Sequence, residues 1–149
     1  MVHAITFAVV FATLYAAHHV GDHWVQTYRQ VIGKARPDWS GRLACVRHVI
    51  TMTITKIAML ALAVAVLDIR LSVKLTALAL TIDAISHYWA DRRTTLAKLA
   101  AIINKSEYFA FGSPRPDRDD NPTAGTGAFH LDQSFHIVFI WVTALIIAL

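Results

Sequence analysis

LDQSFHIVFIWVTALIIAL, residues 131–149, carries Asp132 and His136 near its start and then runs almost entirely apolar to Leu149. An α-helix of about 20 residues crosses the hydrocarbon core of a bilayer. The length and composition of this stretch therefore predict a membrane-spanning helix. Its ionisable side chains would lie together at one end of that helix, where they need an explanation because charge is costly in lipid.

Three more stretches have the same character, since each is mostly apolar with a few polar side chains inside it. They cover residues 4–26, 46–67 and 71–91. None contains an uninterrupted run of 18 apolar residues, so a soluble helical bundle with a very apolar core is the alternative. The first stretch lacks the basic start and the small-residue cleavage site of a signal peptide, and we expect it to span the membrane.

The composition favours the membrane interpretation. Hydrophobic residues make up 56% of the 149 residues, charged residues 16%, and the mean hydropathy is +0.47. Soluble domains are about 45–50% apolar and about 25% charged, and one core of this size cannot bury so much apolar surface. We expect an all-α integral membrane four-helix bundle, a single domain over residues 1–149. The composition excludes a disordered chain and a coiled coil, and Cys45 alone cannot form an internal disulfide.

The basic residues predict the orientation in the inner or plasma membrane. Most follow the first or the third predicted span: Arg29, Lys34, Arg36, Arg42 and Arg47, then Arg92, Arg93, Lys98, Lys105, Arg115 and Arg118. The positive-inside rule places both groups in the cytoplasm and both termini outside. The net charge of +4 is then explained by these segments, and without a helix-turn-helix pattern we expect no nucleic-acid partner.

The cytoplasmic segment 94–129 has two parts. Residues 94–111, TTLAKLAAIINKSEYFAF, predict a helix that lies at the membrane interface. Residues 112–127, GSPRPDRDDNPTAGTG, are rich in proline, glycine and aspartate and predict a flexible segment.

Polar residues recur at one-turn spacing on the predicted spans, and residues four apart share a helix face. They are His18, Asp22 and Gln26; His48; Asp83, His87 and Asp91; and Asp132, Gln133 and His136. At a rise of 1.5 Å per residue the four histidines lie at similar depth, with an aspartate one turn nearer the cytoplasm on three of the spans. The order reverses from His-x-x-x-Asp to Asp-x-x-x-His in the fourth span, which runs in the opposite direction. The pattern therefore predicts one polar site near the cytoplasmic face.

Imidazole and carboxylate groups are ligands for zinc and similar divalent ions. We expect a divalent metal, zinc above all, with the ligands His18, His48, His87, His136, Asp22 and Asp91. Aspartates also orient metal-bound histidines, and the spacing leaves open whether they bind the metal or hold the histidines. The candidate catalytic groups are Asp22, Asp91, Asp132, Gln26 and Gln133. For any single histidine the alternative is a hydrogen-bonding strut between helices, and His19 and His23 form a neighbouring stripe.

Three segments, AAHHVGDHWVQ (16–26), DAISHYWAD (83–91) and FHLDQSFH (129–136), resemble a family of small bacterial and phage membrane proteins catalogued as domain of unknown function 3307. The resemblance implies a four-helix membrane domain. It also implies a site at His18, Asp22, Gln26, His87, Asp91, Asp132, Gln133 and His136. It implies no reaction. This chain departs from the family in its paired His18 and His19 and in its longer segment 112–127.

Three functions fit these patterns. The first is a metal-dependent hydrolase acting at the cytoplasmic interface on a lipid or another membrane-associated substrate, because a bound metal activates water at neutral pH. The second is a proton or metal relay, or a transporter, since intramembrane His/Asp chains also carry protons. The predicted outer halves of the spans are almost purely apolar, so a homo-oligomer would be needed to form a pore. The third is a membrane-anchored interaction or regulatory protein without catalysis.

Overall fold

The computed structural model describes residues 2–113 and 125–149, and these residues contain helices and no strand. The all-α prediction is confirmed for them. The elements are α1 (Val2–Val20), the π-helical turn η1 (Gly21–Val25), α2 (Tyr28–Gly33), α3 (Trp39–Leu67), α4 (Val73–Asp91), α5 (Thr94–Ile102), α6 (Ser106–Ala110) and α7 (Gly127–Ala148).

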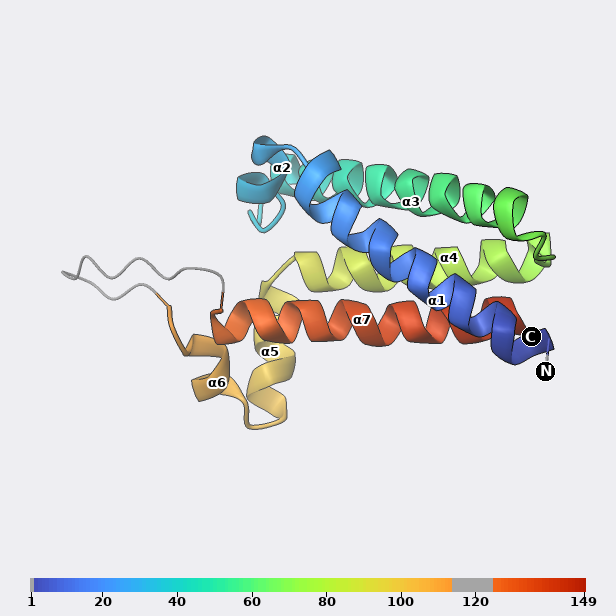
Figure 1. Cartoon of the computed structure of the whole chain (residues 1–149). Helices are drawn as coiled ribbons and strands as arrows, with labels where there is room; N and C mark the ends of the chain where they lie inside the picture. Colours follow the sequence, from blue (N-terminus) through green and yellow to red (C-terminus); the bar gives the residue numbers. More distant parts are fainter. Residues whose placement is uncertain (1, 114–124) are drawn as a thin grey trace.

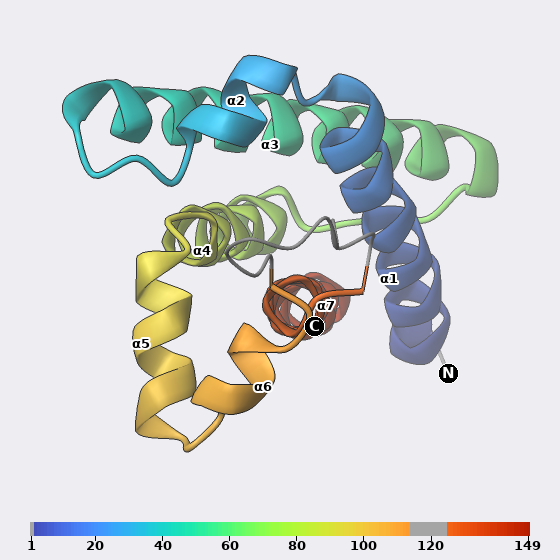
Figure 2. The ribbon, with the colours of Figure 1, turned by 90° about the vertical axis from the view of Figure 1, so that its left-hand side faces the viewer.

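The four long helices pack side by side, and each contacts two of the others. α4 lies against α7, α7 against α1, α1 against α3 and α3 against α4. Figure 2 shows α4 and α7 end-on, whereas α1 and α3 run across that view and therefore cross the pair obliquely. The four long helices thus form a closed ring of contacts.

Both termini lie at one end of the molecule, together with the connection between α3 and α4 (Figure 1). The side chain of His3 contacts the carbonyl oxygen of Ala148 there. The short helices α2, α5 and α6 lie at the opposite end. The basic segments that follow the first and third predicted spans are therefore at the end away from the termini.

Three of the described helices are long and apolar enough to cross a membrane. They are His3–Val25, Trp39–Leu67 and Gly127–Ala148. Helix α4 coincides with the predicted span 71–91 but is not among the three, because Lys74, Asp83, His87 and Asp91 fall within it. The chain therefore has the character of a multi-pass membrane protein, with α4 as its most polar long helix.

Two helices begin earlier than the apolar patterns predict, because polar residues cap them. Helix α3 begins at Trp39 rather than at residue 46, and the Asp38 side chain accepts a hydrogen bond from the Gly41 amide over 2.8 Å. This bond and one from Ser40 hold the pKa of Asp38 below its usual value. Helix α7 begins at Gly127 rather than at residue 131, capped by Thr126.

The predicted interfacial helix 94–111 is divided. Helices α5 and α6 are separated by a turn at residues 103–105, in which Asn104 has a left-handed φ of 57°. A single helix over 94–111 was thus wrong in detail, since asparagine readily adopts this conformation and ends a helix. Most of the predicted flexible segment 112–127 falls at residues 114–124, outside the described residues.

Apolar side chains fill the bundle near the termini and also cover its outside. The buried core contains Val10, Leu14, Leu60, Ala79, Leu80, Ile140, Ala144 and Ile147. On the outside, Ile54, Leu62 and Ile85 are each 60% exposed or more. An extensive apolar exterior is disfavoured in water and suits contact with lipid. The exterior therefore argues against the soluble-bundle alternative.

The start of α7 is clamped against α6, and this contact requires glycine. The Gly127 amide donates to the Phe111 carbonyl oxygen over 2.9 Å, and a Cβ at Gly127 would overlap the Tyr108 carbonyl oxygen. We expect Gly127→Ala to destabilise the protein by about 1–3 kcal/mol, as overpacking does. Thermal unfolding in detergent measures this, with Ser134→Ala on the exposed face of α7 as the control. An unchanged unfolding temperature in Gly127→Ala would contradict the clamp.

Candidate metal centre

Four histidines from four different helices meet inside the bundle. The ring centroids of His87 and His136 are 4.1 Å apart, those of His48 and His87 5.0 Å, and those of His18 and His136 5.0 Å. Each of the four is at most 3% exposed. The helical spacing places one histidine of each long helix on its inner face, and the packing of α1, α3, α4 and α7 brings them together.

Two aspartates complete this His/Asp cluster, which we define as His18, His48, His87, His136, Asp22 and Asp91. His48 Nε2 lies 3.0 Å from His87 Nε2, and both nitrogens lie 3.3 Å from Asp91 Oδ2. His48 Nε2 is also 3.2 Å from Asp22 Oδ1. Ligands that bind zinc tetrahedrally at about 2.0–2.1 Å are separated by about 3.3 Å. These four distances, 3.0–3.3 Å, are close to the edge of such a tetrahedron.

Several atoms of the cluster are buried without a hydrogen-bond partner among the described residues. They include Asp22 Oδ1, Asp91 Oδ2, His18 Nε2 and His136 Nε2. Asp91 Oδ2 lies 3.3 Å from His48 Nε2 and from His87 Nε2, yet it accepts no hydrogen bond from either. Buried polar atoms are usually satisfied, and these unsatisfied atoms belong to residues that could hold a metal ion. Two groups of residues could hold a metal ion, because their ligand atoms lie within 4.8 Å of one another: Asp22, His48 and His87, and His87, Asp91 and His136. His87 belongs to both.

The π-helical turn η1 positions Asp22. Sequence spacing predicted a continuous helix through residue 26, whereas the helix widens at Gly21–Val25. Asp22 Oδ2 remains 3.3 Å from His18 Nε2 on its own segment, while Asp22 Oδ1 reaches His48 on α3. Gly21 packs directly against Met52, where a Cβ would overlap the sulfur. Short π-helical turns are often found at functional sites, and this one directs a carboxylate across the bundle.

One known protein family matches the part of the chain that carries the cluster. The model of the family described as "Protein of unknown function (DUF3307)" matches residues 10–149. The chain belongs to this family. The resemblance predicted from three short segments is therefore confirmed, and the match includes every residue of the His/Asp cluster. No curated protein and no solved structure matches the chain.

Lys34 is a neighbour of the cluster that the sequence did not predict as part of it. In this DUF3307 protein its Nζ lies 2.8 Å from Asp91 Oδ1, and only 10% of its side chain is exposed. Asp91 thus presents one oxygen to Lys34 and the other to His48 and His87. The Lys34 carbonyl oxygen also accepts a hydrogen bond from Arg92 over 2.7 Å. These contacts hold the segment after α2 against the end of α4.

The remaining predicted site residues lie at the margin of the cluster. Asp132 Oδ1 is 3.6 Å from His136 Nε2, and a quarter of the Asp132 side chain is exposed. Gln133 Nε2 donates to Asp132 Oδ2 over 3.3 Å. Gln26 ends the π-helical turn, and its side-chain nitrogen Nε2 is buried without a hydrogen-bond partner among the described residues. The structure therefore joins Asp132 and Gln133 to the edge of the cluster and records no contact from Gln26 to it among the described residues.

Asp83, predicted to share a face with His87 and Asp91, has a different partner. Its Oδ2 lies 2.6 Å from Lys56 Nζ, and the two side chains are 4% and 1% exposed. This ion pair joins α3 to α4 about two turns from His48 and one turn from His87, on the side of the apolar core. In the sequence Lys56 is an isolated charge within an apolar run. No residue near it in the chain indicates that its partner is Asp83.

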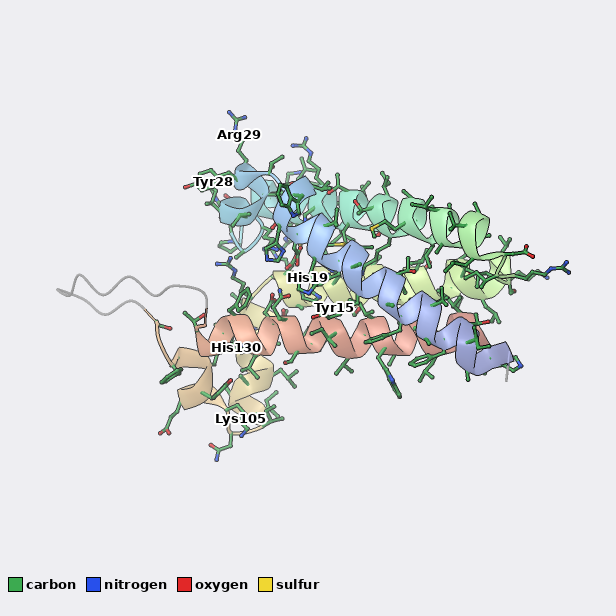
Figure 3. The ribbon with its side chains drawn as sticks, in the orientation of Figure 1. Tyr15, His19, Tyr28, Arg29, Lys105 and His130 are labelled. Atoms are coloured by element: carbon green, nitrogen blue, oxygen red, sulfur yellow. The ribbon has the colours of Figure 1, made fainter. Side chains whose placement is uncertain are left out.

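The other histidines lie outside the cluster. His19 contacts Tyr15, with ring centroids 4.7 Å apart, and His23, at 5.6 Å. Figure 3 shows Tyr15 and His19 together on α1, and His130 near the start of α7. His130 is exposed. Of the paired histidines, His18 is thus the one that faces the cluster, although the rings of His18 and His19 remain close at 5.9 Å.

Proposed function

We propose that this protein is a four-span membrane protein whose His/Asp cluster binds one divalent metal ion, with zinc as the best candidate. α1 with η1, α3, α4 and α7 would be the spans. The observation that supports the metal is the triangle of His48 Nε2, His87 Nε2 and Asp91 Oδ2, with edges of 3.0–3.3 Å. Asp22 Oδ1 is the natural fourth ligand, 3.2 Å from His48 Nε2.

The other two histidines would then orient the carboxylates. His18 lies against Asp22, and His136 lies 3.8 Å from Asp91 Oδ1. Of the two arrangements that the sequence allowed, this proposal has aspartates that bind the metal directly. Burying two carboxylates without a cation would be costly in lipid, and Lys34 compensates only one of them.

We further propose that the centre catalyses hydrolysis. The zinc would have to take a water molecule as a fifth ligand beside His48, His87, Asp91 and Asp22, and it would lower the pKa of that water and so supply a nucleophile. Asp132 is our candidate general base, because it touches the cluster through His136 and is the most exposed of the three carboxylates near it. Gln133 holds its second oxygen. The substrate would be a lipid head group, a lipid-linked phosphate or a membrane peptide.

A proton or metal relay is the second candidate, and the Lys56–Asp83 pair favours it. This pair continues the line of ionisable groups from Asp91 through His87 along α4. Beyond it, however, the space between the helices is filled by Leu14, Leu60, Ala79 and Ile140. A relay would have to cross this apolar core, so a site open to one side only is better supported.

Hydrolysis can be tested by separating catalysis from metal binding. We expect Asp132→Asn to reduce turnover of p-nitrophenyl phosphate or carboxylate esters by about 10²–10⁴-fold, the usual contribution of a general base. Its zinc content should equal that of the wild type. Ser134→Ala, whose exposed side chain lies on the same helix, is the control. Unchanged turnover in Asp132→Asn would contradict the role of Asp132 as a general base. If the wild type has full zinc occupancy but turns over no ester, hydrolysis is contradicted and a non-catalytic interaction protein is favoured.

The proposed orientation has its own test. Both termini should lie outside the cytoplasm, because the basic segments beside α2 and α5 are at the opposite end of the molecule. A C-terminal alkaline phosphatase fusion should therefore be active, and a C-terminal green fluorescent protein fusion should be dark. The same reporters fused after Gly112 should give the reverse pattern. A fluorescent C-terminal fusion would overturn the orientation without affecting the metal site.

A further inference from the structure

A cavity lies beside the cluster, between α5, α6 and the start of α7. Its volume is about 290 Å³, and it is lined by Arg93, Leu96, Phe109, Thr126, Ala128, Phe129 and Asp132. One part of the wall is apolar and contains two phenylalanines and a leucine. The rest is polar and contains a guanidinium, a hydroxyl and a carboxylate. A cavity with both kinds of wall suits a ligand that has both kinds of surface.

Asp132 belongs both to the wall of this cavity and to the edge of the cluster. Its Oδ1 is 3.6 Å from His136 Nε2, and its side chain lines the cavity. Asp22 and Asp91 line no part of it, and their side chains are 12% and 2% exposed. Among the described residues, Asp132 therefore connects the wall of the cavity to the edge of the cluster.

The walls are fixed by specific backbone contacts. The Gly127 amide binds the Phe111 carbonyl oxygen, and Thr126 caps α7. Arg93 has a φ of 55°, a conformation that costs energy for a residue other than glycine. This residue forms the corner between α4 and α5, and Arg92 before it is bound to the segment after α2. The strained corner places Arg93 at the wall of the cavity.

The elements around the cavity also have the properties of a membrane interface. Ile102 is 81% exposed, Phe111 66% and Ile103 54%, and all three belong to α5, α6 or the residues that flank them. Apolar side chains exposed on short helices at the end of a bundle suit the boundary between head groups and acyl chains. A ligand that enters here would come from the lipid phase.

We propose that this cavity binds a single-chain amphiphile with a phosphate head, and that Arg93 recognises the phosphate. Guanidinium groups match the geometry of phosphate oxygens and remain charged. Leu96, Phe109 and Phe129 contact the first carbons of the chain. This inference rests on the proposed function in one respect, since it names the class of substrate that the metal centre would receive. Binding itself requires only the cavity.

Binding is tested with the full chain in lipid nanodiscs and with dodecyl phosphate as the probe. We expect dodecyl phosphate to bind, and Arg93→Gln to weaken its affinity about tenfold or more, as the loss of a charged hydrogen bond does. Phe129→Ser should weaken dodecyl phosphate but leave inorganic phosphate unchanged. Lys98→Gln, an exposed lysine on α5 that does not line the cavity, is the matched control.

The affinities for different probes decide which ligand the cavity takes. Equal affinity for inorganic phosphate and for dodecyl phosphate would assign the cavity to free phosphate and overturn the amphiphile. Equal affinity for dodecyl maltoside, or unchanged binding in Arg93→Gln, would overturn recognition of the phosphate. The same titration in His87→Ala separates the two proposals. Dodecyl phosphate binding by His87→Ala without metal would support the cavity but not the metal centre. Metal binding by the wild type without dodecyl phosphate binding would support the metal centre and contradict the proposed substrate class.

Discussion

Replacing His87 with alanine is expected to abolish stoichiometric zinc binding, whereas the wild-type protein purified in detergent should retain about one zinc ion per chain. His87 is shared by both groups with metal-binding geometry. Its Nε2 is close to His48 and to Asp91, and its ring centroid lies 4.1 Å from that of His136. Removing even a group that only orients a ligand weakens metal affinity by about 10–100-fold, so removing a ligand shared by both groups should exceed that range.

The measurement is zinc content by mass spectrometry after equilibration in a zinc buffer, supported by the absorption spectrum of the cobalt-substituted protein. His19→Ala is the matched control, because His19 is adjacent to His18 in the chain but contacts Tyr15 and His23. His18→Ala and His136→Ala should show the smaller loss of about 10–100-fold expected for residues that orient carboxylates. Stoichiometric zinc in His87→Ala, or none in the wild type, would refute the metal centre.

The second large effect concerns the Lys56–Asp83 pair. We expect Lys56→Met to destabilise the protein by about 3–5 kcal/mol, because it leaves a buried carboxylate without a partner. Both side chains are almost fully buried, and Lys56 Nζ is 2.6 Å from Asp83 Oδ2. Unfolding in a mixed-detergent titration, followed by circular dichroism, measures the free energy difference.

The double variant Lys56→Met/Asp83→Leu makes this test specific. Replacing both partners of a buried pair by apolar residues is often neutral or stabilising, so the double variant should regain most of the lost stability. Lys74→Met, an exposed lysine on α4, should have little effect. If the double variant is as unstable as the single one, the loss comes from packing of the lysine stem and not from the unpaired charge.

Residues at regular helical spacing were predictable from the sequence. Four residues advance a helix by about one turn, so His18 and Asp22, His87 and Asp91, and Asp132 and His136 had to share faces. Their apolar surroundings required each face to turn inward. The family match covers the same segments. The convergence of the four histidines therefore follows from local patterns and from the need to keep polar groups away from lipid.

Features that depend on contacts between segments were not predictable. Lys34 has no periodic relation to Asp91, and its 2.8 Å contact arises only because the segment after α2 lies against the end of α4. Lys56 and Asp83 meet across two helices. The π-helical turn depends on how Gly21 packs against Met52. In each case tertiary packing determines the result, and the local sequence has no signal for it.

The Lys56–Asp83 pair also bears on how the chain enters a membrane. Among the described long helices, α4 alone is not a candidate span. The charge of its Asp83 is paired with that of Lys56 on α3. A carboxylate that meets its counter-ion before leaving water enters lipid at lower cost than one that enters alone. Only residues 68–72 separate the two helices. We therefore expect α3 and α4 to leave the translocon as one hairpin, so that the unit inserted into the membrane would be a pair of helices.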